Sequence, residues 1–170
     1  MNYPIGIEMD VEQAVAVVIK QFLSVDDIPD ATMKAKLIDN GLEQITGVNV
    51  TTWTGDESAQ SGDPTREQAL PPFVNITCIP VSVDKRGSQW ESMLMIEIRT
   101  MRTQGNDPSA RKLALLSRSV AAALDYGDFH TPANVVHQIH CLRTGGDGNV
   151  QDNHNIQNFE ARVLICGNNI

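Results

Sequence analysis

The sequence predicts an α+β protein whose helices pack on one face of a mostly antiparallel sheet. The expected order of elements is α-α-β-β-β-α-β-β, which lacks the strict strand–helix alternation of a parallel sheet. Two long strand-like segments, 73–83 and 90–102, are joined by a turn at 85–88, which predicts a long antiparallel hairpin. No repeat, heptad array or linker divides the chain, so residues 1–170 are expected to form a single domain.

The first two elements are expected to be helices. Asp10 resembles a helix N-cap, and the first helix should run to about Ser24. Its apolar stripe has helical spacing and consists of Val11, Val15, Val18 and Phe22. A second helix should begin near Asp30, and it either ends at Asn40-Gly41 or continues to Ile45.

Three strands should follow, with a long loop between the first two. Residues 47–53 contain β-branched side chains and predict a strand. Residues 54–70 are polar and rich in small side chains, which predicts an extended, exposed loop. Residues 73–83 form the clearest strand, and Pro80 within it indicates a bulge or an edge position. Residues 90–102 alternate between an apolar and a mixed face, as a half-buried strand does.

The second half of the chain predicts one helix and two strands. Asp107-Pro108 is a strong helix start, and the Ala- and Leu-rich residues that follow should be helical to about residue 124. Strands are expected over 134–143 and 157–166. The Gly-, Asp- and Asn-rich residues 144–156 predict a second extended loop between those strands.

Composition excludes several classes of protein. The longest apolar run is far shorter than the ~20 residues that a membrane-spanning helix requires. The N-terminus lacks the basic start and apolar core of a secretory signal. Three widely spaced cysteines, Cys78, Cys141 and Cys166, lie in apolar segments and are expected to be buried free thiols. A net charge of -8 disfavours general binding to nucleic-acid phosphates.

Charge is distributed unevenly along the chain. Residues 1–84 contain 13 acids and 4 bases, a net charge of -9. Residues 85–118 contain 3 acids and 7 bases, a net charge of +4. Residues 119–170 contain 5 acids and 2 bases, a net charge of -3. Copies of the chain could therefore pair an acidic face with a basic one, or the pattern is simply that of a solvated surface.

No sequence motif indicates catalysis or a cofactor. The chain has no phosphate-binding loop, dinucleotide fingerprint, nucleophile elbow or zinc-protease motif. The best metal candidate combines His137, His140 and Cys141 with Cys166, but neighbouring residues on a strand point to opposite faces. His140 would then diverge from the other two, so we expect no metal site, no cofactor and no catalytic residue.

The layout resembles the tail-terminator, or tail-completion, proteins of long-tailed bacteriophages. The features that carry the resemblance are a leading helix, a proline-marked strand at 71–76, its long partner at 93–101, a helix that ends in an Ala/Leu run at 120–124, and two closing strands. The resemblance extends from about Val11 to Ile165 and also rests on size and acidic character.

The resemblance implies a structural role in a virion rather than an enzymatic one. Proteins of that family form a hexameric ring at the head-proximal end of the tail tube, where they stop tube growth. The implied partners are further copies of the chain, the tail tube protein, and a neck or head-completion protein. DNA would pass through the ring without specific binding, and the protein would be made in the host cytoplasm and reside in the virion.

Four residues are candidate contacts between subunits in such a ring: Arg99, Arg102, Trp53 and Trp90. The arginines lie on the polar face of a long strand, and the tryptophans are rare large side chains in a chain with 5% aromatic residues. Both pairs of residues also have an explanation that involves no second subunit, because the arginines could be solvated and the tryptophans could pack in the core. The loops at 54–70 and 144–156 are candidates for docking a partner ring or lining the lumen.

Two other functions remain open from the sequence. The chain could be a different virion part, such as a neck, head-completion or tail-tube protein, since these share small α+β or β-rich scaffolds. It could also be a small cytoplasmic enzyme or ligand-binding protein that uses the region of Cys141, Cys166 and His140.

Overall fold

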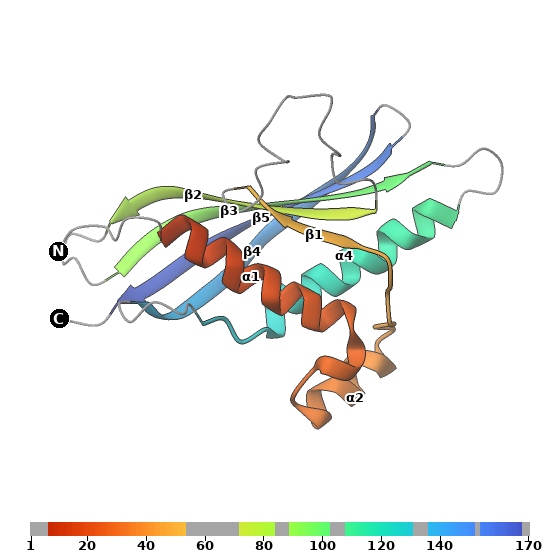
Figure 1. Ribbon diagram of the computed structural model, residues 1–170, viewed down its shortest axis with the longest axis horizontal. Helices are drawn as coiled ribbons and strands as arrows, with labels where there is room; N and C mark the ends of the chain where they lie inside the picture. Colours follow the sequence, from red (N-terminus) through yellow and green to blue (C-terminus); the bar gives the residue numbers. More distant parts are fainter. Residues whose placement is uncertain are drawn as a thin grey trace.

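The computed structural model describes residues 7–53, 72–83, 89–102, 108–130, 136–151 and 154–167 (Figure 1). The α+β class and the predicted order of elements are confirmed. The helices are α1 (Ile7–Leu23), a short 3-10 turn η1 (Val25–Asp27), α2 (Ala31–Asp39) and α4 (Pro108–Tyr126). The strands are β1 (Asn49–Thr52), β2 (Phe73–Val83), β3 (Gln89–Met101), β4 (Val136–Gln151) and β5 (His154–Gly167).

The strands form one sheet in the order β1-β2-β3-β5-β4. The predicted hairpin of β2 and β3 is confirmed, with Ile76 opposite Ile96 at its centre. The register shifts between Pro80 and Ser82, as expected for a bulge at the proline. β3 pairs with β5 and β5 with β4, both antiparallel. β1 differs, because it runs parallel to β2, so the sheet is mostly rather than wholly antiparallel.

Helices α1 and α4 cover the same face of the sheet, as predicted (Figure 1). Alternate residues of β3 point toward them, and Leu94, Ile96 and Ile98 are almost fully buried. Val11, Val15 and Ile19 of α1 and Leu116 and Val120 of α4 form the opposite side of this core. Burial of each such side chain contributes about 2 kcal/mol to the free energy of unfolding. Gly127 permits close contact after α4, since a Cβ there would lie 2.4 Å from a Val18 methyl carbon.

Helix α1 begins earlier than predicted. Asp10 was expected to be its N-cap, but the helix starts at Ile7 and Asp10 lies inside its first turn. An acidic side chain stabilises either position, because both lie at the positive end of the helix dipole. The sequence signal was therefore correct for a helix start but did not fix the residue at which it occurs.

Helix α2 begins where the sequence placed it. The Asp30 side chain accepts hydrogen bonds from the backbone N–H groups of Thr32 and Met33, each at 2.9 Å. Of the two predicted ends, the structure has the earlier one, since α2 stops at Asp39 and Gly41 follows with a φ of 90°. Figure 1 shows α2 below the main body, at one end of α1.

The predicted loop at 144–156 is wrong. β4 continues to Gln151 and β5 begins at His154, so most of this segment is a paired hairpin. Its backbone can hydrogen-bond to β5 whatever side chains it carries, which is why Gly- and Asn-rich composition misled the prediction. The register shifts between Arg143 and Gly145, where the strand adjusts its pairing. The other predicted loop, 54–70, lies outside the described residues.

In the part of the chain that the structure describes, no helix has the length and apolar content needed to span a bilayer.

Candidate interaction surface

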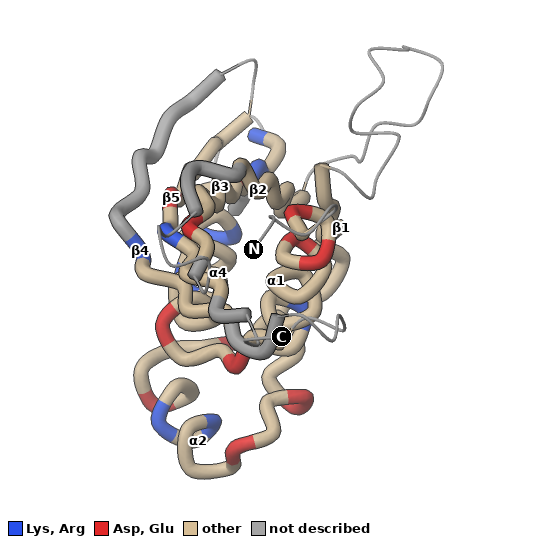
Figure 2. Tube along the Cα trace, turned by 90° about the vertical axis from the view of Figure 1, so that its left-hand side faces the viewer, with Lys and Arg blue, Asp and Glu red and all other residues tan. Residues whose placement is uncertain are grey.

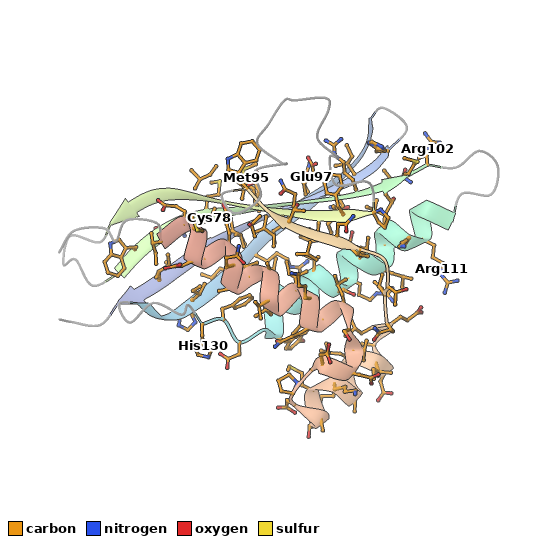
Figure 3. All side chains as sticks on the ribbon, viewed as in Figure 1. Cys78, Met95, Glu97, Arg102, Arg111 and His130 are labelled. Carbon is orange, nitrogen blue, oxygen red and sulfur yellow. The ribbon has the colours of Figure 1, made fainter. Side chains whose placement is uncertain are left out.

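The face of the sheet turned away from α1 and α4 bears several large apolar side chains. We call it the open face. Strand alternation places residues of odd number in β2 and β3 on this face, opposite the buried residues of even number. Figure 3 shows Met95 and Glu97 on this side of the sheet. The exposed apolar side chains of the open face, each between 40% and 51% accessible, are Ile79, Met93, Met95, Met101 and Leu142.

A hollow of about 450 Å³ lies at the centre of the open face. Two rows of cross-strand neighbours form its floor: Asn75, Glu97 and Asn158 in one, and Thr77, Met95 and Glu160 in the other. Trp53, which follows β1, borders it and is 44% exposed. The hollow therefore combines an aromatic and a thioether side chain with carboxylates and amides, a mixture typical of protein contact surfaces.

Arg99 has partners within its own chain. Its Nε lies 2.6 Å from an oxygen of Glu97, and its guanidinium carbon lies 5.9 Å from the centre of the Phe73 ring. The side chain is 26% exposed. Arg102 is exposed beyond the end of β3 (Figure 3). The assignment of Arg99 and Arg102 to contacts with another subunit stays a prediction, and Arg102 is the more accessible of the two.

The two tryptophans occupy opposite environments. Trp53 is half-exposed beside the hollow, as a contact residue requires. Trp90 has 0% exposure and belongs to the core, so the prediction that it anchors another subunit is wrong. It lies at the start of β3 on the helix-facing side, in line with Leu94 and Ile96, and burial of its large apolar surface explains the placement.

Two of the cysteines, Cys78 and Cys141, are thiols whose reactivity is lowered by burial. Burial raises the pKa of the Cys78 thiol to about 12 and that of the Cys141 thiol to about 12. Both thiols are therefore neutral near pH 7, and only a thiolate is a good nucleophile or metal ligand. His140 is exposed and Cys141 is half-buried on the opposite face of β4, as strand geometry predicts. The side chains of His137 and Cys166 lie outside the described residues. Within the described ranges, no three potential metal-binding side chains cluster.

A second hollow, of about 480 Å³, lies on the helical side of the molecule. Val17 of α1 is 54% exposed there, beside Gln13 and Gln21. The other wall includes Asp128 and His130, whose side chains lie 2.9 Å apart. Figure 3 shows His130 on the helical side of the sheet. The molecule thus has two chemically different surfaces that expose apolar side chains, one on each side of the sheet.

The acidic and basic segments of the sequence meet within one chain. Arg118 donates to the Gly41 carbonyl at 2.7 Å, and Lys112 donates to the Thr46 carbonyl at 3.5 Å. Arg111 lies 3.8 Å from a carboxylate oxygen of Glu43. Figure 2 shows acidic residues on α1 and around α2. Part of the basic segment therefore holds the residues that follow α2, and this part is not a free face for another copy.

The two edges of the sheet differ. β4 forms one edge, and Phe129 makes an isolated bridge to it at Ile139. In the described ranges, no other strand lies on that side of β4. At the other edge, β1 covers β2 only as far as Ile76. Sequence reasoning identified the β2–β3 hairpin but missed that β4, the longest strand, is an edge.

A buried acid was also missed. Glu12 of α1 has 0% exposure, and its Oε1 accepts a hydrogen bond from the backbone N–H of Cys78 at 2.8 Å. The sequence contained a signal for it, because Glu12 shares a helical face with Ala16 and Ile19, both buried. An acid in line with apolar residues indicates a specific buried partner.

Comparisons with known proteins give no family. No family model matches the chain, and no curated protein matches it. Among solved structures, the chain is similar to one in a structure titled "Virion of native gene transfer agent (GTA) particle". The two are 16% identical with a TM-score of 0.45, over 92% of this chain and 98% of the other. A likeness at this level does not establish a shared function.

Proposed function

We propose that this chain is a non-enzymatic structural protein of a phage-like virion. In this proposal it forms a hexameric ring that terminates the tail tube and joins it to the neck or head connector. The observation that carries the proposal is the open face, where apolar side chains and Trp53 are exposed on the broad side of a five-stranded sheet. Exposed apolar patches of this kind are typical of protein–protein contact sites.

A ring closes through heterologous contacts, so each subunit needs two unlike surfaces. The open face and the hollow beside Val17 supply two such surfaces on opposite sides of the sheet. The outer side of β4, beyond its bridge to Phe129 at Ile139, offers a third mode of contact, because an edge strand can pair with an extended segment of a neighbour. These features support assembly, and the layout of the sequence supports the tail terminator as the assembly.

Within the ring, Trp53 is proposed to contact a neighbouring subunit, and Arg102 to donate to one. Arg99 would take part only if its contact with Glu97 opened or extended to a further acid. Residues 1–170 are proposed to act as one domain, because α1, α4 and the sheet share one buried cluster.

The proposed partners are the tail tube protein and a neck or head-completion protein, with the ring located in the virion. A net charge of -8 suits a channel through which DNA moves, since a negative wall repels phosphates. DNA would therefore pass without specific binding.

Other virion positions are the nearest alternatives, because a neck or tube protein would need the same kind of contact surfaces. An enzyme or ligand-binding protein built around Cys141 is less well supported, since its thiol has a pKa of about 12. The test that separates these functions is the position of the labelled chain in assembled particles. One ring at the head-proximal end of the tail supports the proposal, stacked rings indicate a tube protein, and absence from particles contradicts a structural role.

A further inference from the structure

The side of β2 that β1 leaves uncovered shows two features that remove hydrogen-bond donors. Trp53 donates from its backbone N–H to the Ile76 carbonyl at 2.9 Å, so the main-chain groups of Ile76 point away from β3. The main-chain groups of Cys78 and Pro80 point to the same side as those of Ile76, because backbone groups two residues apart in a strand share a direction. In the described ranges, no strand pairs with β2 on this side beyond Ile76.

Neither of these two positions offers a donor to another chain. The Cys78 N–H donates to the Glu12 carboxylate at 2.8 Å. Pro80 has no N–H at all, and the register shift that follows it bends the strand. Glu12 is fully buried, and burial of an acid is costly unless its hydrogen bonds compensate. A leucine would fill the same space without that cost, so the presence of an acid indicates a function that a leucine could not perform.

We propose that Glu12 and Pro80 together close this edge of the sheet to other β-strands, so that copies of the chain cannot pair through β2. Among residues 77–80, only positions 78 and 80 point away from β3. The Glu12 carboxylate accepts the hydrogen bond of the Cys78 N–H and Pro80 has no N–H, so neither position can donate to a neighbouring strand. Natural sheets block exposed edges with such charges, prolines and bulges, because an open edge pairs with any extended chain. On the edge formed by β4, the Ile139 N–H donates to Phe129, but residues 140–151 contain no proline, which leaves this part of β4 as the side for strand addition. This inference does not depend on the proposed virion role.

The test compares four variants with the wild-type protein by light scattering over a wide range of concentration. Glu12→Gln keeps an oxygen that can accept from Cys78 and should leave the mass unchanged. Pro80→Thr restores an outward N–H and should increase association. The double variant Glu12→Leu with Pro80→Thr should associate most, with a mass about two-fold above wild type as copies pair edge to edge. Pro29→Thr is the matched control, because it makes the same exchange at an exposed position before α2, away from the sheet.

Hydrogen exchange identifies the surface that associates. In the double variant, the amides of residues 78 and 80 should gain protection as concentration rises, whereas the same region of Pro29→Thr should not change. A folded double variant that keeps the wild-type mass overturns the proposal. If the double variant does not fold, Pro80→Thr and Pro29→Thr decide, and equal masses for these two variants overturn it. Loss of stability without added association shows that Glu12 only anchors α1.

Discussion

Gly41 joins α2 to the segment that α4 holds in place. Its φ of 90° is unfavourable for any other residue, and a Cβ there would lie 2.5 Å from a guanidinium nitrogen of Arg118. Gly47 also has a positive φ, of 68°, but a Cβ there would meet nothing within 4 Å. The two glycines therefore separate the cost of backbone strain from the cost of displacing Arg118.

Replacement of Gly41 by alanine should destabilise the protein more than the same change at Gly47. We expect Gly47→Ala to lower the free energy of unfolding by about 1 kcal/mol, the cost of a left-handed residue with a side chain. Gly41→Ala should lower it by about 2–3 kcal/mol, because the Arg118 hydrogen bond is also disturbed. Urea denaturation of both variants measures this, and equal losses would show that the Arg118 contact contributes little.

Two thiols, the buried Cys78 and the half-buried Cys141, make the folded protein less stable at high pH. Cys78 and Cys141 each have a pKa of about 12 in the folded protein, against 9.0 for an ordinary thiol. The raised pKa means that the folded state holds the thiol proton more tightly than the unfolded state does. The contribution of each thiol to the free energy of unfolding is therefore complete below pH 9 and is lost as pH rises toward 12. Each thiol should lower the free energy of unfolding by about 1.4 kcal/mol per pH unit in that range.

Comparison with Cys78→Ala isolates the thiol from the lysines and tyrosines that titrate in the same range. The variant should lose less stability than wild type between pH 9 and pH 11, measured as the difference between urea midpoints. A parallel loss in both proteins would show that the Cys78 thiol ionises equally well in the folded and unfolded states.

Single residues were predictable where a local rule decides their position. Asp30 is a helix cap because its oxygen reaches two free backbone N–H groups of the next turn, and that requires nothing beyond α2. Trp90 and Glu12 were not predictable in this way. Which side of β3 faces α1, and which backbone N–H lies opposite Glu12, depend on contacts between segments far apart in the sequence.

At the β4 edge of the sheet, the part of the chain that the structure describes contains no further strand. Ile139 donates from its N–H to the Phe129 carbonyl at 3.4 Å, so that N–H points away from β5. The N–H groups of Cys141 and Arg143 point the same way, because these residues lie two and four positions after Ile139 and precede the register shift at Gly145. The side chain of Arg143 lies 3.5 Å from Asp125, so a variant must account for that pair as well.

Arg143→Pro should weaken assembly while the subunit stays folded. The proline removes an N–H from the outer side of β4 and leaves the pairing of β4 with β5 intact. Arg143→Thr is the control, since it loses the same ion pair but keeps the N–H. We expect a roughly ten-fold rise in the concentration at which Arg143→Pro assembles, from the loss of about 1.4 kcal/mol per subunit. Light scattering on both variants measures this, and equal behaviour would exclude β4 as a contact.

The elements that the sequence predicted well have strong local signals. α1, α4 and the β2–β3 hairpin each show an apolar period that matches their geometry, and only residues 84–88 separate the two strands. The second half of β4 and the parallel pairing of β1 have no such signal. Residues 144–151 are extended because β5 lies beside them, and β1 pairs with β2 across a segment of 20 residues, 53–72, in the sequence.

At the scale of the whole molecule, the sheet separates two different environments. Helices and the core occupy one side, and the open face with its central hollow occupies the other (Figures 1 and 3). Part of the basic segment makes its contacts within the chain, because Arg118, Lys112 and Arg111 contact the residues after α2. Contacts between copies should therefore depend more on the open face and on β4 than on paired acidic and basic segments.

The decisive measurement for the proposed function is the position of the labelled chain in intact particles, seen by electron microscopy. We expect a single ring of six copies at the junction of tail and neck, with the label absent from the rest of the tail. Label distributed along the tail, or particles of normal appearance that contain no labelled chain, would contradict it.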